Sequence, residues 1–121
     1  MFTVDYNTEE IRRICTDEIY ARNRYGEELQ KELYILLNVF DSVPSLNAIY
    51  NMYSSKHGKV KQLLLGKRDT LSLYINDSFD LIFVPTKKGD GDIWRNFKFP
   101  DEFKDVDSIK IIGIEKKGLR K

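Results

Sequence analysis

Residues 62–75 read QLLLGKRDTLSLYI, and residues 79–85 read FDLIFVP after the short polar segment Asn76-Asp77-Ser78. Apolar and polar residues alternate on both sides of that segment, which is the pattern of two strands that each bury one face. The sequence therefore predicts a hairpin of strands 70–76 and 79–84 joined by a tight turn. Leu71, Leu73 and Ile75 are expected on one face of it, and Ser72 and Tyr74 on the other. Residues 60–65 are predicted to form a third strand.

Helical patterns fill the first half of the chain. Asn7 or Thr8 is expected to cap a first helix, because two glutamates follow in its first turn. Thr16 or Asp17 can cap the chain again, and Gly26 marks a break or the helix end. A second helix is predicted through Leu29, Leu33, Leu36, Leu37 and Phe40, which recur at helical spacing and stop before Pro44. A short helix is expected within residues 45–53.

The remaining pattern gives the fold class. Alternating residues predict a first strand at 2–6 and a last strand at 106–115, and a long loop occupies residues 85–107. Helices and strands are thus grouped separately along the chain, which is typical of an α+β fold. We expect one domain, residues 1–121, with two N-terminal helices packed on one face of a mainly antiparallel sheet of four to five strands. The leucine stripe of the second helix should pack against Leu71, Leu73 and Ile75.

Composition narrows the class of protein. The chain has 121 residues, of which 41% are hydrophobic and 12% aromatic, as in a compact globular domain. No apolar run approaches the roughly 20 residues of a membrane span, and the first residues lack a secretory pattern. We therefore expect a cytoplasmic protein without a membrane association. The single cysteine, Cys15, is expected to be a small buried hydrophobe, with a reactive thiol as the alternative. One histidine and one cysteine do not make a metal site, so no metal or cofactor is expected.

Charge is distributed unevenly along the chain. Residues 1–55 hold five basic and nine acidic side chains, whereas residues 56–121 hold fifteen basic and ten acidic ones. Residues 56–68 contain no acidic residue, and the C-terminal tail adds four further cations. Such clusters attract phosphate backbones, although a solvated surface explains them equally simply.

Several motifs in this order resemble the RelE/HigB-like toxins of type II toxin–antitoxin modules, particularly the branch named after the killer protein of plasmid maintenance systems. The resemblance runs nearly end to end. It rests on Val4-Asp5-Tyr6, the run Ile11-Arg12-Arg13-Ile14-Cys15-Thr16-Asp17, Ala21, Tyr25-Gly26, Ser45-Leu46 and the hairpin region from Leu64 to Pro85. The Ile-Cys-Thr-Asp, Tyr-Gly and Leu-x-Gly-x-Arg steps are those of that branch.

The resemblance implies a metal-independent endoribonuclease that enters the ribosome and cuts messenger RNA with the ribose 2′-hydroxyl as the nucleophile. It implies a cognate antitoxin of the HigA-like, helix-turn-helix type, through which alone the toxin would contact DNA. Carried over by position, Lys67 and Arg68 are the catalytic candidates. The candidates for binding RNA or the ribosome are Lys59, Lys61, Lys67, Arg68, Tyr74, Lys116 and Lys117.

The chain also departs from the family pattern. Gln62, Leu65 and Asp80 stand where the family commonly has a polar residue such as histidine, a lysine and an arginine, and Lys116-Lys117-Gly118 replaces an Asp-Tyr-His-like ending. Tyr74 could stack on a base or be structural, and His57 is expected to be a solvated residue of the link. Two functions therefore stay open: a ribosome-dependent RNase with an altered set of residues, or a RelE-like fold that poisons another target or only binds its antitoxin.

Overall fold

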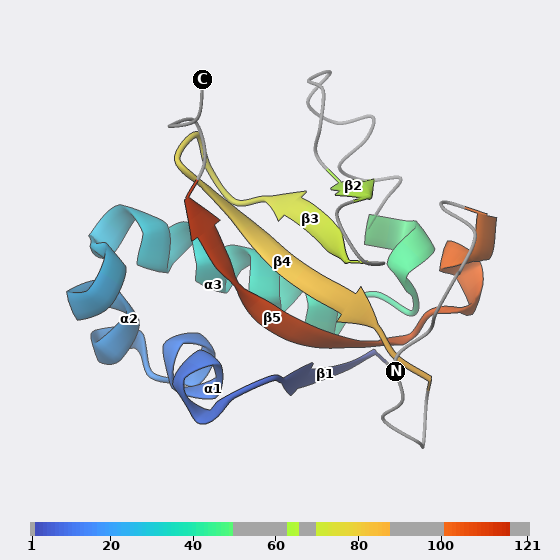
Figure 1. The fold of residues 1–121 in the computed structure, drawn as a ribbon, viewed down its shortest axis with the longest axis horizontal. Coiled ribbons are helices and arrows are strands. Elements are labelled where there is room, and N and C mark those ends of the chain that lie inside the picture. Colours follow the sequence, from blue (N-terminus) through green and yellow to red (C-terminus); the bar gives the residue numbers. More distant parts are fainter. Residues whose placement is uncertain (1, 50–62, 66–69, 88–100, 117–121) are drawn as a thin grey trace.

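The computed structural model describes residues 2–49, 63–65, 70–87 and 101–116. Residues 46–49 are helical. The other elements are β1 (Thr3–Tyr6), α1 (Glu9–Thr16), α2 (Glu18–Tyr25), α3 (Glu27–Ser42), β2 (Leu63–Leu65), β3 (Leu71–Tyr74), β4 (Phe79–Pro85), the 3-10 helix η2 (Asp101–Asp105) and β5 (Ser108–Lys116) (Figure 1). Within these ranges, no helix is both long and apolar enough to cross a membrane.

Five strands form one mixed sheet in the order β1-β5-β4-β3-β2. The β2–β3, β3–β4 and β4–β5 pairs are antiparallel, and β1 lies parallel to β5. The α+β class is thus confirmed, and the sheet is mixed rather than purely antiparallel. The helices carry the chain from β1 at one edge to β2 at the opposite edge, and the antiparallel strands then lead back, so that β5 pairs with β1 in parallel.

Before residue 43 the structure has three helices, α1, α2 and α3, where two were predicted, so that prediction is wrong in number. The backbone of Asp17 is extended, and its side chain accepts a hydrogen bond from the Tyr20 N–H, which caps α2. Its own N–H still donates to the Arg13 carbonyl, so α2 begins directly where α1 ends. Thr8 caps α1 as expected, through a 3.2 Å bond from the Ile11 N–H to its hydroxyl oxygen.

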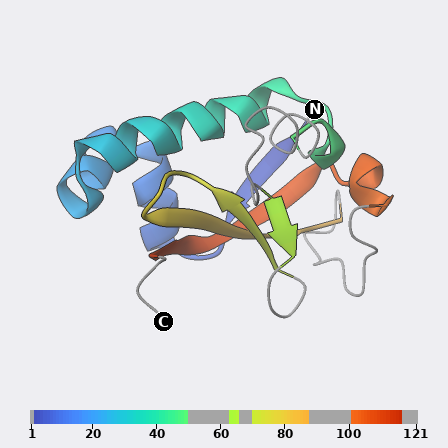
Figure 2. The same ribbon diagram turned by 90° about the horizontal axis from the view of Figure 1, so that it is seen from above.

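The core lies between α3 and one face of the sheet, as Figure 2 shows from above. Leu29, Leu33, Leu36 and Phe40 of α3 are buried, and so are Leu71, Leu73 and Ile75 of the hairpin. Leu37 of the predicted stripe is only partly buried. The ring of Phe40 lies 5.4 Å from that of Phe2 and 5.7 Å from that of Phe83, so α3 packs against both the residue before the edge strand β1 and the central strand β4.

The hairpin has its expected faces and turn. Ser72 and Tyr74 point to the face opposite the core, since both are half-buried between buried neighbours. Within the turn, the side-chain oxygen of Asn76 accepts hydrogen bonds from the N–H groups of Ser78 and Phe79, at 2.8 and 2.9 Å. An asparagine side chain that bonds its own backbone in this way fixes a tight turn.

The strand after the long loop contains a bulge. Ile82 of β4 lies opposite Gly113, whereas the next residue, Phe83, lies opposite Ile111, so Ile112 has no partner in register. The predicted loop contains the 3-10 helix η2, in which Phe103 is buried, and β5 begins at Ser108 rather than at the predicted residue 106. The Thr86 and Ser108 hydroxyls meet at 2.6 Å and are buried.

Cys15 is buried, as predicted for a small apolar residue. Burial raises the pKa of its thiol to about 12. A thiol with that pKa remains protonated and unreactive near neutral pH.

The leucine stripe of α3 gives a direct test of the packing. Leu33 is fully buried, whereas Ile35, two residues further along, is 63% exposed. We expect Leu33→Ala to lower the free energy of unfolding by about 2–5 kcal/mol, because it leaves a cavity in the core. The matched change Ile35→Ala should cost less than about 0.5 kcal/mol. Urea unfolding followed by circular dichroism measures both, and equal losses would contradict this arrangement.

Candidate functional site

The sheet has one face that no helix covers within the described ranges. In Figure 1, α3 passes behind β3, β4 and β5, and the opposite face of these strands is turned toward the viewer. Alternation along the strands places Ser72, Tyr74, Ile82 and Lys110 on this face, and all four are half-buried. We call it the open sheet face. The tyrosine that was predicted to bind RNA, Tyr74, is one of its residues.

A row of polar residues crosses the open sheet face near the turn of the hairpin. Tyr74 of β3 lies opposite Asp80 of β4, and Asp80 in turn lies opposite Glu115 of β5. Lys116, the next residue, lies opposite Phe79 at the last position of β5. This end of the sheet therefore holds two of the predicted binding residues, Tyr74 and Lys116. The carboxylate residues Asp80 and Glu115 lie on β4 and β5 at the same end.

Tyr74 is held by an acidic partner from the turn. Its hydroxyl donates to a carboxylate oxygen of Asp77 at 2.6 Å. This hydrogen bond is the largest cause that raises the pKa of Tyr74 to about 12, and burial and the nearby charges of Asp77, Glu32 and Asp80 add to it. The phenol therefore stays protonated near neutral pH and is not a proton acceptor there. Its ring remains a surface on which a base can stack.

Negative charge extends from this row toward α3. The pKa of Glu32 is raised, chiefly by burial and then by the neighbouring charges of Glu28 and Asp77. The carboxylates of Asp77, Asp80 and Glu32 thus lie near Tyr74, and Asp80 stands where the family that the sequence resembles commonly has an arginine. Such an environment repels a phosphate unless basic residues neutralise it.

The other predicted site residues lie outside the described residues: Lys59, Lys61, Lys67, Arg68 and Lys117. The same holds for two of the departures from the family pattern, Gln62 and Gly118. Within the described ranges, no three histidine, cysteine, aspartate or glutamate side chains gather in a way that could hold a metal ion.

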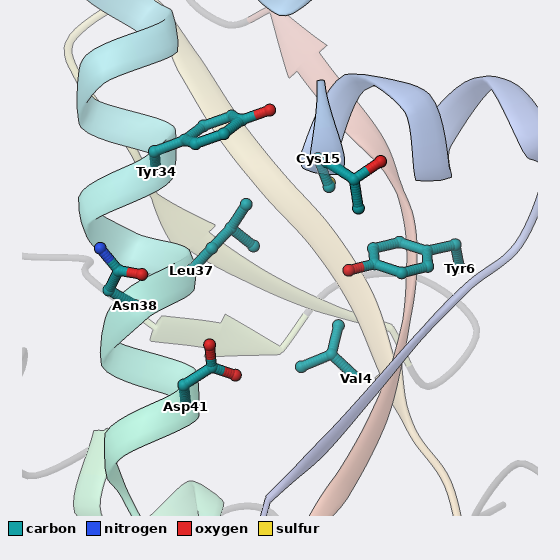
Figure 3. Close-up of a pocket in the computed structure, with 8 residues that line it drawn as sticks. Val4, Tyr6, Cys15, Tyr34, Leu37, Asn38 and Asp41 are labelled. Carbon is teal, nitrogen blue, oxygen red and sulfur yellow. The ribbon is translucent and has the colours of Figure 1, made fainter. Parts of the chain in front are cut away.

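A second feature is a pocket of about 240 Å³ between β1, α1 and α3. Figure 3 shows the Tyr6 hydroxyl entering this space from β1 and the Asp41 carboxylate entering it from α3, beside the apolar side chains of Val4 and Leu37. The pKa of Tyr6 is raised, first by burial and then by the nearby Cys15 thiol. The smaller effect of Asp41 also raises the Tyr6 pKa, and Arg12 opposes it. A half-buried phenol and a carboxylate therefore share one small space.

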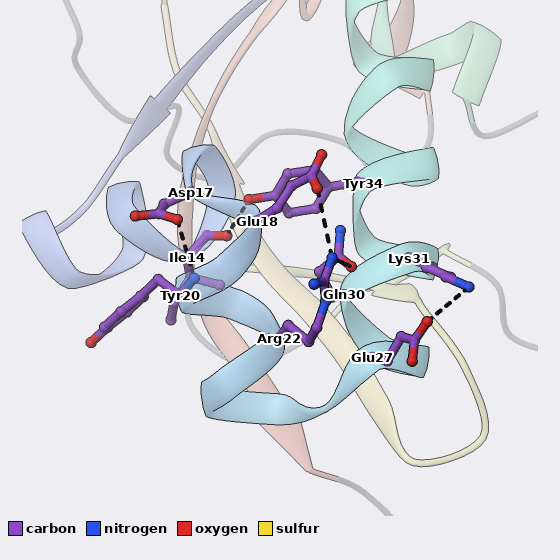
Figure 4. A network of polar contacts seen from close by, with 9 residues as sticks. All are labelled: Ile14, Asp17, Glu18, Tyr20, Arg22, Glu27, Gln30, Lys31 and Tyr34. Carbon is purple, nitrogen blue, oxygen red and sulfur yellow. Dashed lines mark hydrogen bonds and ion pairs between the residues drawn. The ribbon is translucent and has the colours of Figure 1, made fainter.

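The walls of this pocket are fixed by a polar network (Figure 4). The Tyr34 hydroxyl of α3 donates to the Ile14 carbonyl at the end of α1, at 2.8 Å. Arg22 of α2 donates to the Gln30 side chain of α3 at 3.4 Å and lies 3.7 Å from Glu18. These contacts tie α1, α2 and α3 together, so the pocket is part of the fold and does not depend on a loop.

Sequence reasoning missed this pocket. Tyr34, Asn38 and Asp41 line it from α3 and are spaced i, i+4 and i+7, so they form a polar stripe beside the leucine stripe. That spacing was the available signal. The contribution of Tyr6 could not be read in the same way, because it requires knowing that β1 lies at the sheet edge beside α1 and α3.

The Tyr74–Asp77 contact predicts a specific pH dependence. Asp77→Asn should bring the pKa of Tyr74 down from about 12 toward the ordinary value of 10, because the charged acceptor is removed. Since the native state holds this proton more tightly than the unfolded chain, the contact stabilises the fold below pH 10, and this stabilisation is lost as the pH rises through 12. Ultraviolet titration of the phenolate measures the shift, with Tyr74→Phe to assign the signal. An unchanged Tyr74 titration in Asp77→Asn would contradict the assignment.

No protein-family model, no curated protein and no solved structure matches this chain.

Proposed function

We propose that this chain is the toxin of a type II toxin–antitoxin system of the RelE/HigB kind, and that it inhibits translation by cutting messenger RNA on the ribosome. The motif resemblance, in its order along the chain, supports the family. The observation that carries the site is the open sheet face, on which Tyr74 lies at the end of the sheet where Lys116 ends β5. The proposed activity takes place in the cytoplasm, where the ribosomes are.

In this proposal the chemistry is a transfer within the RNA itself. The ribose 2′-oxygen attacks the adjacent phosphorus, the bond to the 5′-oxygen breaks, and that oxygen takes up a proton. Lys67 and Arg68 act as the catalytic cations that stabilise the negative charge developing on the phosphate. Lys59, Lys61, Lys116 and Lys117 hold the RNA or ribosomal backbone, and the ring of Tyr74 stacks on a base. The nucleophile belongs to the RNA, so this reaction needs no metal or other cofactor.

A second candidate function is favoured by the acidic row. Asp80 lies opposite Tyr74 on the next strand, and Glu115 lies opposite Asp80 on the strand after that. The carboxylate of Asp77 accepts the hydrogen bond of the Tyr74 hydroxyl. A RelE-like fold with carboxylates at this place is suited to a partner that brings cations. It would act as a poison of another target, as ParE-like toxins do, or as a module that binds its antitoxin without cutting RNA.

A charge reversal at Arg68 tests the nuclease proposal. Arg68→Glu should abolish growth inhibition in bacteria that lack the antitoxin, because it removes a phosphate contact and adds repulsion where negative charge develops. The matched control Lys31→Glu reverses a charge on the exposed side of α3 and should stay toxic. Cleavage of messenger RNA on purified translating ribosomes should be lost in the same variant.

Asp80→Arg, which restores the residue usual in the family, should leave toxicity equal or raise it. If Arg68→Glu folds and remains fully toxic, the nuclease proposal is wrong and the second candidate function becomes the better account. Toxicity without any cut RNA in the ribosome assay leads to the same conclusion.

The proposed antitoxin gives a further prediction. We expect it to cover the basic surface near Lys61, Lys67 and Arg68, because inhibition by occlusion requires complementary charge there. Its association rate should fall steeply with added sodium chloride, and Lys67→Glu should slow association while Lys31→Glu should not. Stopped-flow or biosensor kinetics measure both effects. An antitoxin whose association is insensitive to Lys67→Glu, and which contacts only the acidic N-terminal helices, would contradict occlusion.

A further inference from the structure

The pocket between β1, α1 and α3 contains two polar groups with no partner among the described residues. Neither the Tyr6 hydroxyl nor the Asp41 carboxylate makes a hydrogen bond or an ion pair there, although both enter the pocket (Figure 3). By contrast, the Tyr34 hydroxyl donates to the backbone carbonyl of Ile14, and the Thr16 hydroxyl donates to the backbone carbonyl of Arg12 at 2.7 Å. The pocket thus keeps one charged and one neutral acceptor available for a ligand.

The rest of the lining is mainly apolar and aromatic. Val4 and Leu37 contribute aliphatic side chains, and the rings of Tyr6 and Tyr34 contribute two aromatic surfaces. A cation is attracted to an aromatic face, and here the Arg12 guanidinium already lies 5.3 Å from the centre of the Tyr6 ring. A volume of about 240 Å³ admits a short chain of methylene groups but not a large ligand.

The position of Asp41 is unfavourable for the helix that carries it. Asp41 lies in the last turn of α3, which contains no basic residue. A carboxylate at that end of a helix is destabilised by the helix dipole. Helix stability therefore does not account for this aspartate, which is exposed and lines the pocket.

We propose that this pocket binds a primary ammonium group carried on a short unbranched alkyl chain. The Asp41 carboxylate and the Tyr6 oxygen each accept one N–H, the third N–H points to the open side and stays hydrated, and the alkyl chain lies on Val4 and Leu37. Such a group occurs in small aliphatic amines and in the side chain of a lysine. The inference does not depend on the proposed toxin activity and concerns a different part of the molecule.

Titration of the isotope-labelled protein with n-butylammonium chloride, followed by amide chemical shifts, tests the site. We expect saturable shifts at Val4, Tyr6, Cys15 and the last two turns of α3. The neutral analogue n-butanol, at matched salt, should bind at least about tenfold more weakly, because it lacks the charge that Asp41 recognises. Equal binding of the two compounds would overturn the proposal.

Three variants make the test specific. Asp41→Asn should lower the affinity about tenfold, and Tyr6→Phe about fivefold. The control Glu28→Gln removes a carboxylate from the exposed first turn of the helix that carries Asp41 and does not line the pocket, so it should leave binding unchanged. Asp41→Asn should also raise the melting temperature by about 1–4 °C, since it removes the unfavourable helix-end charge. A loss of binding that accompanies a more stable protein cannot come from unfolding, and unchanged binding in Asp41→Asn would refute the proposal.

The source of the ammonium group is settled by a second comparison. Cadaverine represents a free amine, and Nα-acetyl-lysine N-methylamide represents a lysine within a protein chain. Tighter binding of cadaverine supports a small amine as the ligand, and tighter binding of the lysine derivative supports a partner protein. Failure of both to bind where n-butylammonium binds would contradict a natural ligand of this class.

Discussion

Packing of α3 against the sheet is the constraint on which the rest of this molecule depends. Leu33 and Phe40 are fully buried between the helix and the strands, and each such side chain contributes about 1.5–3 kcal/mol through burial. Within the described ranges, helices cover only one face of the sheet, and that side also holds the pocket between β1, α1 and α3. The open sheet face and the pocket thus both follow from the packing of α3 against one face of the sheet.

The sequence predicts the local elements well, and the reason is that they depend on nearby residues. The hairpin follows from the alternation around Leu71 and Leu73, and the cap of α1 follows from Thr8 before two glutamates. The break at Asp17 has a local cause too, because one side chain ends α1 and begins α2. Whether one helix or two form here depends on whether the Asp17 cap stabilises the chain more than a continuous helix would. The composition of the segment alone does not decide between the two.

The parts that could not be predicted depend on contacts between distant residues. The parallel pairing of Thr3–Tyr6 with Ser108–Ile111 joins the two ends of the chain, and no pattern within either segment specifies it. That pairing places β1, and with it Tyr6, beside the pocket that Asp41 also lines. In the same way, Glu115 joins Tyr74 and Asp80 only because of the register between β4 and β5. The family resemblance directed attention to Lys67 and Arg68, which lie outside the described residues, whereas the described charges near Tyr74 are the carboxylates of Asp77, Asp80 and Glu32.

The bulge at Ile112 has a consequence for how this strand can change during evolution. It shifts the alternation of β5 by one position, so that Ile111 and Ile114 both lie opposite core residues of β4, Phe83 and Leu81, while Glu115 joins the polar row. Without a bulge, regular alternation from Ile111 would place Ile114 on the open sheet face and Glu115 on the core face, whereas deletion of Ile112 would restore regular pairing and leave both on their present faces. The bulge thus separates β5 into a first half, whose register is fixed by β1 and by the buried contact of Ser108 with Thr86, and a second half, whose register is fixed by the hairpin. The loss of one residue at the bulge can therefore be accommodated without moving either half.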